Sequence, residues 1–366
     1  MTSPHSSLLA QLCTLVAVDF DSMDPAAAQR HGASTFTDMT SNQAIAYAQA
    51  TQPENADLVG EAVKYVRALY PNPEEQPEPA VYLREVIDVA SVRMAMLVYP
   101  HLTGRVLVQI SPAFAYDTEQ TIAQAKRLVS LFDEHGIQRS RVCIKIPSTP
   151  ESLLACRALS SPPSGSHETP IHTLATGVFC LAQARAAVQA GCSYVAPYFN
   201  DSLELRVHFE SGMWKAYEDP VTQHPMSSVI ASIIAALKGS GTLVMPARDC
   251  PVCGSIITES EVIALVRLRP DHITISASVL DKLAASPAVP DVLLSPFTIE
   301  SLEDTTTHVD YLAGGGALLR DALEQDPDVS RRVVDALELF GACERRLMEY
   351  VRSRKLGVEW DGVTGW

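Results

Sequence analysis

One stretch decides how this chain folds, and it reads VCIKIPST at residues 142–149. Its apolar and β-branched residues, bounded by Arg141 and Pro147, predict a short strand buried on both faces. Lys145 stands inside that strand, where an ammonium group is costly unless it has a partner or a function. Either the lysine head reaches water beyond the strand end, or burial makes it an amine nucleophile able to form a Schiff base with a carbonyl.

Seven more apolar segments of this kind alternate with helical segments along the chain. This order of strand and helix, repeated eight times, is typical of α/β proteins with a closed parallel (β/α)8 TIM barrel of roughly 250 residues. The expected strands cover residues 15–19, 34–42, 105–111, 141–147, 171–178, 193–199, 243–247 and 271–277.

The barrel is expected to span residues 12–286 of a single domain that occupies residues 1–366, with extra N- and C-terminal helices. Residues 300–356 form the C-terminal helical extension. Apolar residues on one side of 329–354 predict an amphipathic helix there, packed either on the barrel exterior or over its mouth. Those apolar residues are Val333, Leu337, Phe340, Leu347 and Val351.

Composition excludes several classes of partner. The formal net charge of -15 argues against binding to nucleic acid or to anionic membranes, which requires clusters of lysine and arginine. No apolar run reaches the roughly 18 residues of a membrane span, and no basic segment precedes the N-terminal apolar residues as in a signal peptide. We therefore expect a cytoplasmic protein that acts on a small molecule.

Eight cysteines are present, and six of them lie in segments that read as buried. In an intracellular chain these are expected to be free core thiols. The remaining pair, Cys250-Pro-Val-Cys253, has a spacing suited to zinc or redox chemistry, but a single pair is too little to indicate a site. We expect no metal. The six are Cys13, Cys143, Cys156, Cys180, Cys192 and Cys343.

Polar residues stand near the carboxyl ends of six expected strands. Each has an ordinary alternative: Asp19 and Asn42 can cap helices, and Gln109 can be a bonded interior residue. Because the carboxyl ends of barrel strands face one mouth, the residues together predict a polar pocket around a buried amine. The six are Asp19, Asn42, Gln109, Lys145, Thr176 and Tyr198.

The chain resembles the transaldolase family from about residue 12 to residue 286. The most specific stretches are residues 142–149, GRVLVQISPAFAYDTEQTIAQAKRLVSLFDEHGI at 104–137 and LAQARAAVQAGCSYVAPY at 181–198. The resemblance implies a class I (Schiff-base) aldol barrel that needs no cofactor and assembles as a homodimer or larger oligomer.

The resemblance also implies roles for individual residues. Lys145 resembles the Schiff-base lysine, and Asp19 matches the carboxylate that handles the hydroxyl proton during carbon–carbon cleavage. Asn42, in Thr40-Ser41-Asn42, matches an asparagine that binds substrate hydroxyls. Thr176 matches a threonine that helps to hold the catalytic water.

Two departures from the family pattern refine this expectation. Transaldolases carry a glutamate where this chain has Gln109. The fructose-6-phosphate aldolase branch has glutamine there and uses a tyrosine of the sixth strand as acid/base, which Tyr198 matches. Glutamine orients a water but does not exchange its proton, so another group must do that work. Ala196, in the same strand, is placed among the substrate-binding positions.

The phosphate site is the second departure. Asp201 stands where the family has an arginine, and Arg248 and Cys250 replace its serine and its second basic residue. A carboxylate in place of a cation repels phosphate, so Arg248 and Asp201 are expected to face a substrate without a phosphate group. The alternative is a realigned loop in which Arg206 and Lys215 restore a phosphate site.

The sequence therefore predicts an aldolase- or transaldolase-type lyase or transferase acting on a small carbonyl compound. Two alternatives stay open. One is an ordinary transaldolase of the pentose phosphate pathway. The other is a catalytically silent barrel that binds a ligand or partner, because loss of the acid and of the cations also fits decay.

Overall fold

The structure is a computed structural model, and it describes residues 6–32, 35–72, 77–162, 169–200, 217–247, 258–297 and 309–354. Eight parallel strands form one sheet in the order β7-β6-β5-β4-β3-β2-β1-β8. The amide of Thr274 also donates to the Pro246 carbonyl across the remaining gap, so the barrel is nearly closed. This confirms the expected (β/α)8 fold. The strands are β1 Ala17–Asp21, β2 Met39–Thr40, β3 Val106–Gln109, β4 Val142–Pro147, β5 His172–Val178, β6 Tyr194–Pro197, β7 Leu243–Val244 and β8 His272–Ile275.

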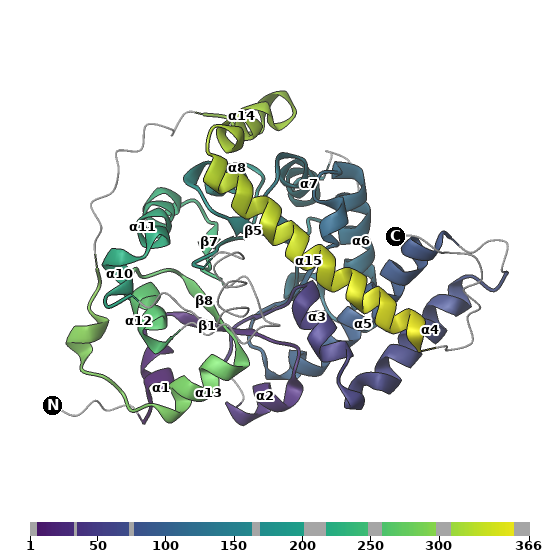
Figure 1. The fold of residues 1–366 in the computed structure, drawn as a ribbon, viewed down its shortest axis with the longest axis horizontal. Helices are drawn as coiled ribbons and strands as arrows, with labels where there is room; N and C mark the ends of the chain where they lie inside the picture. Colours follow the sequence, from purple (N-terminus) through teal and green to yellow (C-terminus); the bar gives the residue numbers. More distant parts are fainter. Residues whose placement is uncertain are drawn as a thin grey trace.

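Helices surround the strands, and the last one crosses in front of them (Figure 1). Their apolar sides cover the outer face of the sheet, as the alternation of strands and helices requires. The helices are α1 Leu8–Leu12, α2 Pro25–Arg30, α3 Gln43–Ala50, α4 Ala56–Leu69, α5 Pro79–Val98, α6 Thr118–Glu134, α7 Pro150–Ser160, α8 Leu181–Gln189, α10 Pro220–Gln223, α11 Pro225–Leu237, α12 Glu259–Arg267, α13 Ala277–Ala285, α14 Ala313–Glu324 and α15 Pro327–Ser353.

All eight strands differ by one or more residues from their expected bounds, and β1, β2 and β7 illustrate the differences. Strand β1 lies two residues further along than expected, because Phe20 pairs with Met39 and Asp21 pairs with Thr40. Strand β2 ends at Thr40, since the side chain of Asn42 already caps helix α3. Strand β7 is only two residues long. Apolar runs thus located these strands, whereas their ends depend on pairing and capping.

Helix α15 begins at Pro327, where the carboxylate of Asp326 accepts hydrogen bonds from the amides of Asp328 and Val329. This is the usual combination of an aspartate N-cap and a proline in the first turn. Its buried side packs against α3, α5, α14 and the short 3-10 helix η4, Pro112–Phe114. Each large apolar side chain buried there contributes about 1.5–3 kcal/mol. The buried apolar residues are Val329, Val333, Ala336, Phe340, Cys343, Leu347 and Val351.

The position of α15 decides between the two expected placements. Val333, Ala336 and Phe340 line one small cavity together with residues at the carboxyl ends of β3, β5 and β6. The helix therefore covers the mouth of the barrel, as its diagonal course in Figure 1 shows.

Two other sequence expectations are tested by the fold. Within the described ranges, no helix combines the length and the apolar character needed to cross a membrane. Cys13 is exposed, which contradicts its expected burial, because it caps the end of α1 where the chain turns. Cys180 is half-buried, and the Cys250/Cys253 pair lies outside the described residues. The other four, Cys143, Cys156, Cys192 and Cys343, are buried and form no disulfide bond with another described residue.

Candidate active site

Lys145 is the fourth residue of β4, a strand in which every residue is buried. Only 1% of its surface is exposed, so its head does not reach solvent beyond the strand end. Its Cα is in register with Gln109 on β3 and with Leu174 on β5. Lys145 shares its face of β4 with Pro147, which lines the cavity at the barrel mouth. The amine is therefore directed into the barrel.

The mouth cavity joins three of the expected site residues. Gln109, Thr176 and Tyr198 all line it, although they come from three different strands or strand ends. The Thr176 Oγ1 and the Tyr198 hydroxyl are 2.9 Å apart and share a hydrogen bond. Gln109 donates through Nε2 to Gln43 Oε1 at 2.9 Å, while its own Oε1 is buried and meets no donor in the described part of the chain. The cavity has a volume of about 20 Å³.

Asn42 is the N-cap of α3. Its Oδ1 accepts hydrogen bonds from the amides of Ala44 and Ile45, each at 3.0 Å. Its Nδ2 is buried and has no hydrogen-bond partner among the described residues. The capping interpretation thus accounts only for the oxygen of the side chain.

Asp19 is fully buried in the middle of β1. His272 Nδ1 lies 2.9 Å from its Oδ2 and 3.1 Å from its Oδ1, and the Asp38 amide donates to Oδ1 at 2.9 Å. Burial raises the pKa of Asp19 to about 6, although the hydrogen bond and charge of His272 oppose that rise. Burial alone would lower the pKa of His272, but the hydrogen bond and charge of Asp19 raise it above its usual value. The two side chains form a tightly coupled pair.

The partners of Asp19 stand at the amino ends of their strands. His272 is the first residue of β8, and Asp38 immediately precedes β2. Tyr194, the first residue of β6, packs edge-on against the His272 ring and accepts a hydrogen bond from Arg105 Nη1 at 2.6 Å. The polar cluster around Asp19 is thus distinct from the residues at the mouth.

This placement corrects the expectation that Asp19 is the polar residue nearest the end of its strand. Asp21 ends β1 instead, because the strand continues two residues further. It is buried, and Thr40 Oγ1 donates to its Oδ1 at 2.6 Å. Sequence reasoning missed both Asp21 and His272. The available signals were a second aspartate on the same face of β1 and a histidine at the start of β8.

Asp19, Asp38 and His272 also bring three atoms of metal-binding type within 4.8 Å of one another. The His272 Nδ1 to Asp19 Oδ2 distance of 2.9 Å is that of a charge-assisted hydrogen bond, and a proton between the two accounts for it. We therefore read this cluster as a hydrogen-bonded pair with a neighbouring carboxylate.

Of the remaining expected site residues, only Ala196 lies within the described ranges. Ala196 is buried in β6, with its Cα in register with Thr176. Asp201, Arg248 and Cys250 lie outside the described residues, as do the two cations of the following loop.

Comparison with known proteins bears on the whole barrel. The sequence pattern of the family Transaldolase/Fructose-6-phosphate aldolase matches residues 18–325, which is most of the chain. A transaldolase of Saccharomyces cerevisiae is 27% identical over 319 residues, covering 87% of each chain. One from Aliivibrio salmonicida is 25% identical, covering 94% of this chain and 98% of the relative. One from Glaesserella parasuis is 28% identical over 184 residues, and there the match spans only 54% of the relative. The chain therefore belongs to the transaldolase/fructose-6-phosphate aldolase family and is an aldolase-type enzyme.

Proposed function

We propose that this enzyme makes, breaks or transfers a carbon–carbon bond next to a carbonyl, with Lys145 as the nucleophile. The observation that carries the proposal is the burial of Lys145 inside the barrel, beneath a mouth lined by polar groups. A buried ammonium is costly unless it has a partner or a function, and burial of a lysine in general favours the neutral amine that a Schiff base requires.

The chemistry needs several proton transfers. The Lys145 amine adds to the carbonyl carbon, and loss of water gives an iminium. The adjacent carbon–carbon bond then breaks, its electron pair moves toward the iminium nitrogen to form an enamine, and a hydroxyl proton leaves the departing fragment. We assign that proton to Asp21, because it ends β1 at the carboxyl end of the strand, where the mouth lies, whereas Asp19 lies deeper with His272 and Asp38.

Formation of the iminium releases a water, and its hydrolysis consumes one, so the site must hold a water in both steps. The mouth cavity of about 20 Å³ is large enough for one water, and it offers the Gln109 acceptor together with the Thr176 and Tyr198 hydroxyls. Gln109 orients this water, and Tyr198 exchanges its proton with Thr176 as hydrogen-bond partner. Asn42 Nδ2 donates to a substrate hydroxyl. The small side chain of Ala196, whose Cα is in register with Thr176, leaves room for the substrate beside β5.

The substrate in this proposal carries no phosphate. The support is the sequence, in which Asp201 and Cys250 replace cations of the family pattern. Gln109 and Tyr198 likewise favour the aldolase branch over the transaldolases proper. The alternative is an ordinary transaldolase of sugar phosphates, which is favoured by the names of the curated relatives.

Borohydride trapping tests both proposals. Dihydroxyacetone and fructose 6-phosphate are each incubated with enzyme and borohydride, and the modified residue is located by mass spectrometry. We expect a dihydroxyacetone adduct on Lys145 that is absent from Lys145→Met and retained in Lys282→Met, an exposed lysine of α13. Efficient trapping of fructose 6-phosphate, with transfer to erythrose 4-phosphate, would decide for the ordinary transaldolase. Folded protein that traps no carbonyl donor at all would indicate a silent barrel.

A further inference from the structure

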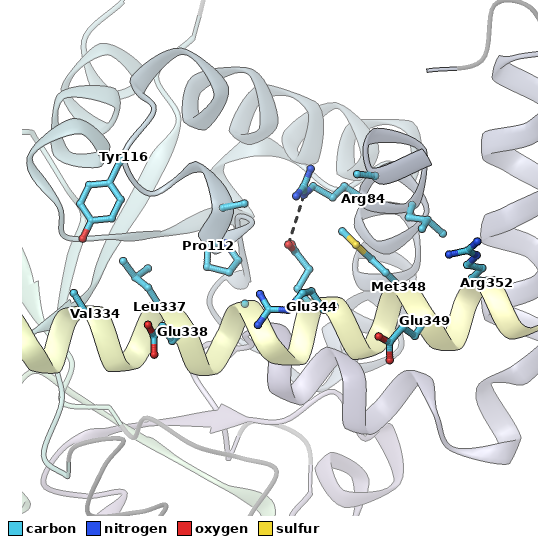
Figure 2. A pocket seen from close by; sticks show the side chains of 15 residues that line it. Arg84, Pro112, Tyr116, Val334, Leu337, Glu338, Glu344, Met348, Glu349 and Arg352 are labelled. Atoms are coloured by element: carbon cyan, nitrogen blue, oxygen red, sulfur yellow. Dashed lines mark ion pairs between the residues drawn. The ribbon is translucent and has the colours of Figure 1, made fainter. Parts of the chain in front are cut away.

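A second cavity lies outside the barrel, between α5, η4 and α15 (Figure 2). Its volume is about 480 Å³, within the range of pockets that hold small molecules. Its walls are mainly apolar, formed by Leu83 of α5, Pro112 of η4, and Leu337 and Met348 of α15. None of the residues proposed to catalyse the reaction lines it.

Helix α15 carries a glycine, Gly341, in the wall of the cavity where it passes η4. A Cβ at Gly341 would lie 4.0 Å from Pro112 Cγ and 3.3 Å from Arg345 Nη1, so a larger side chain would project into this space. Glycine inside a helix costs about 1 kcal/mol relative to alanine. The helix thus bears a cost at a residue that lines the cavity.

The floor of the cavity is polar and incompletely bonded. Glu344 is 5% exposed, and its Oε2 accepts a hydrogen bond from Ser111 Oγ at 2.9 Å. Arg84 Nε lies 3.5 Å from the same oxygen and forms an ion pair with it, as the dashed line in Figure 2 marks. A guanidinium carries five N–H donors, and this single long contact engages only one of them. The remaining donors of Arg84 therefore require a further acceptor.

The charges around the rim agree with that requirement. Arg345 is exposed on α15 and adds a second guanidinium beside the opening. Glu338 and Glu349 are exposed and therefore solvated, which weakens their repulsion of an anion. Glu344 lies next to Arg84 and disfavours a doubly charged group there. A singly charged planar anion fits best, because a guanidinium binds a carboxylate through two parallel hydrogen bonds.

We propose that this cavity binds a small monocarboxylate with an apolar body, its carboxylate on Arg84 and its body against Leu83, Pro112 and Met348. This is a ligand site separate from the aldol chemistry and independent of the proposed function.

Phenylacetate and its uncharged analogue phenylacetamide test the site. Binding to the full chain is followed by isothermal titration calorimetry and by ligand-induced changes in melting temperature. We expect saturable binding of phenylacetate and at least tenfold weaker binding of the amide. Two variants remove the site by different means: Arg84→Met removes the donor, and Gly341→Leu fills the space with every charge kept. Each is expected to weaken phenylacetate binding at least tenfold.

Arg346→Met is the matched control, because Arg346 is an exposed arginine of α15 that does not line the cavity. It should bind phenylacetate as the wild-type chain does. The proposal is overturned if phenylacetate, 4-phenylbutyrate and octanoate all fail to bind saturably, or if acid and amide bind equally. It is also overturned if Gly341→Leu keeps wild-type affinity. That variant decides the outcome if loss of Arg84 unfolds the protein by leaving Glu344 unpaired.

Discussion

Asp19 gives the folded chain a pH dependence opposite in sign to ordinary acid denaturation. Burial raises its pKa from 3.8 to about 6, so between these pH values the folded chain holds a proton that the unfolded chain has released. Stability linked to this group is complete below pH 3.8 and is lost as pH rises through about 6. At 1.36 kcal/mol per pH unit, the loss is at most about 3 kcal/mol. His272 has the same sign, because its pKa is also raised in the folded state.

The Asp19→Asn variant removes this titration with little change of shape. Its amide oxygen can still accept from His272 or from the Asp38 amide, and it carries no charge to desolvate. We expect the variant to gain up to about 3 kcal/mol over the wild-type chain between pH 4 and pH 8. The free energy of unfolding in urea, measured across that range for both proteins, gives the difference directly.

Asp57→Asn is the control for this experiment, since Asp57 is an exposed residue in the first turn of α4. Its difference from the wild-type chain should stay nearly constant with pH. The reasoning is refuted if the Asp19→Asn difference is also constant. It is equally refuted if the wild-type chain gains on the variant as pH rises, which would mean that the charge of His272 outweighs the burial of Asp19.

Three further substitutions test the mouth. Asn42→Ala should lower the free energy of unfolding by about 1 kcal/mol, because the helix loses its cap. Asn42→Asp should keep the stability of the wild-type chain but not its turnover, because aspartate retains the capping oxygen and lacks the Nδ2 donor. Full turnover in Asn42→Asp would exclude a role for that nitrogen. Tyr198→Phe should lower the rate of aldol cleavage by 10²-fold or more, because the variant lacks the hydroxyl that exchanges the proton of the water. Its free energy of unfolding should change by only about 1 kcal/mol, the contribution of the hydrogen bond to Thr176. An unchanged rate in a cleavage assay would remove Tyr198 from the mechanism. Phe340→Ala should lower the free energy of unfolding in urea by about 3–5 kcal/mol, because Phe340 is buried on the side of α15 that faces the mouth. A loss below about 1 kcal/mol would show that α15 does not pack there.

Local signals in the sequence were enough to define helices and to locate strands. Helix α3 starts where Asn42 caps it, and α12 starts at the capping box of Thr258 and Glu261, so residues close in sequence fix where both helices begin. Strand ends depend on the neighbouring strand. The extent of β1 follows from its pairing with β2, and no property of residues 15–21 alone specifies that pairing.

The site residues likewise include some that the sequence predicts and some that it does not. The polar strand-end residues Gln109, Thr176 and Tyr198 meet at the mouth because every parallel strand presents its carboxyl end there. The partner of Asp19 was beyond such reasoning, since His272 is 253 residues away in the sequence. Only closure of the barrel between β1 and β8 brings the two together.

Helix α15 connects these features, because it positions the mouth from two directions. Gln109 is held through its side chain by Gln43 of α3, a helix on which α15 packs. Two residues beyond Gln109, the Ser111 hydroxyl donates to Glu344 of α15. Leu337 of the same helix lines both the mouth cavity and the larger cavity beside it. Any displacement of α15 must therefore break or carry along the contacts that fix the end of β3. The helix is thus part of the support for the group proposed to orient the catalytic water, and not only a cover over the barrel.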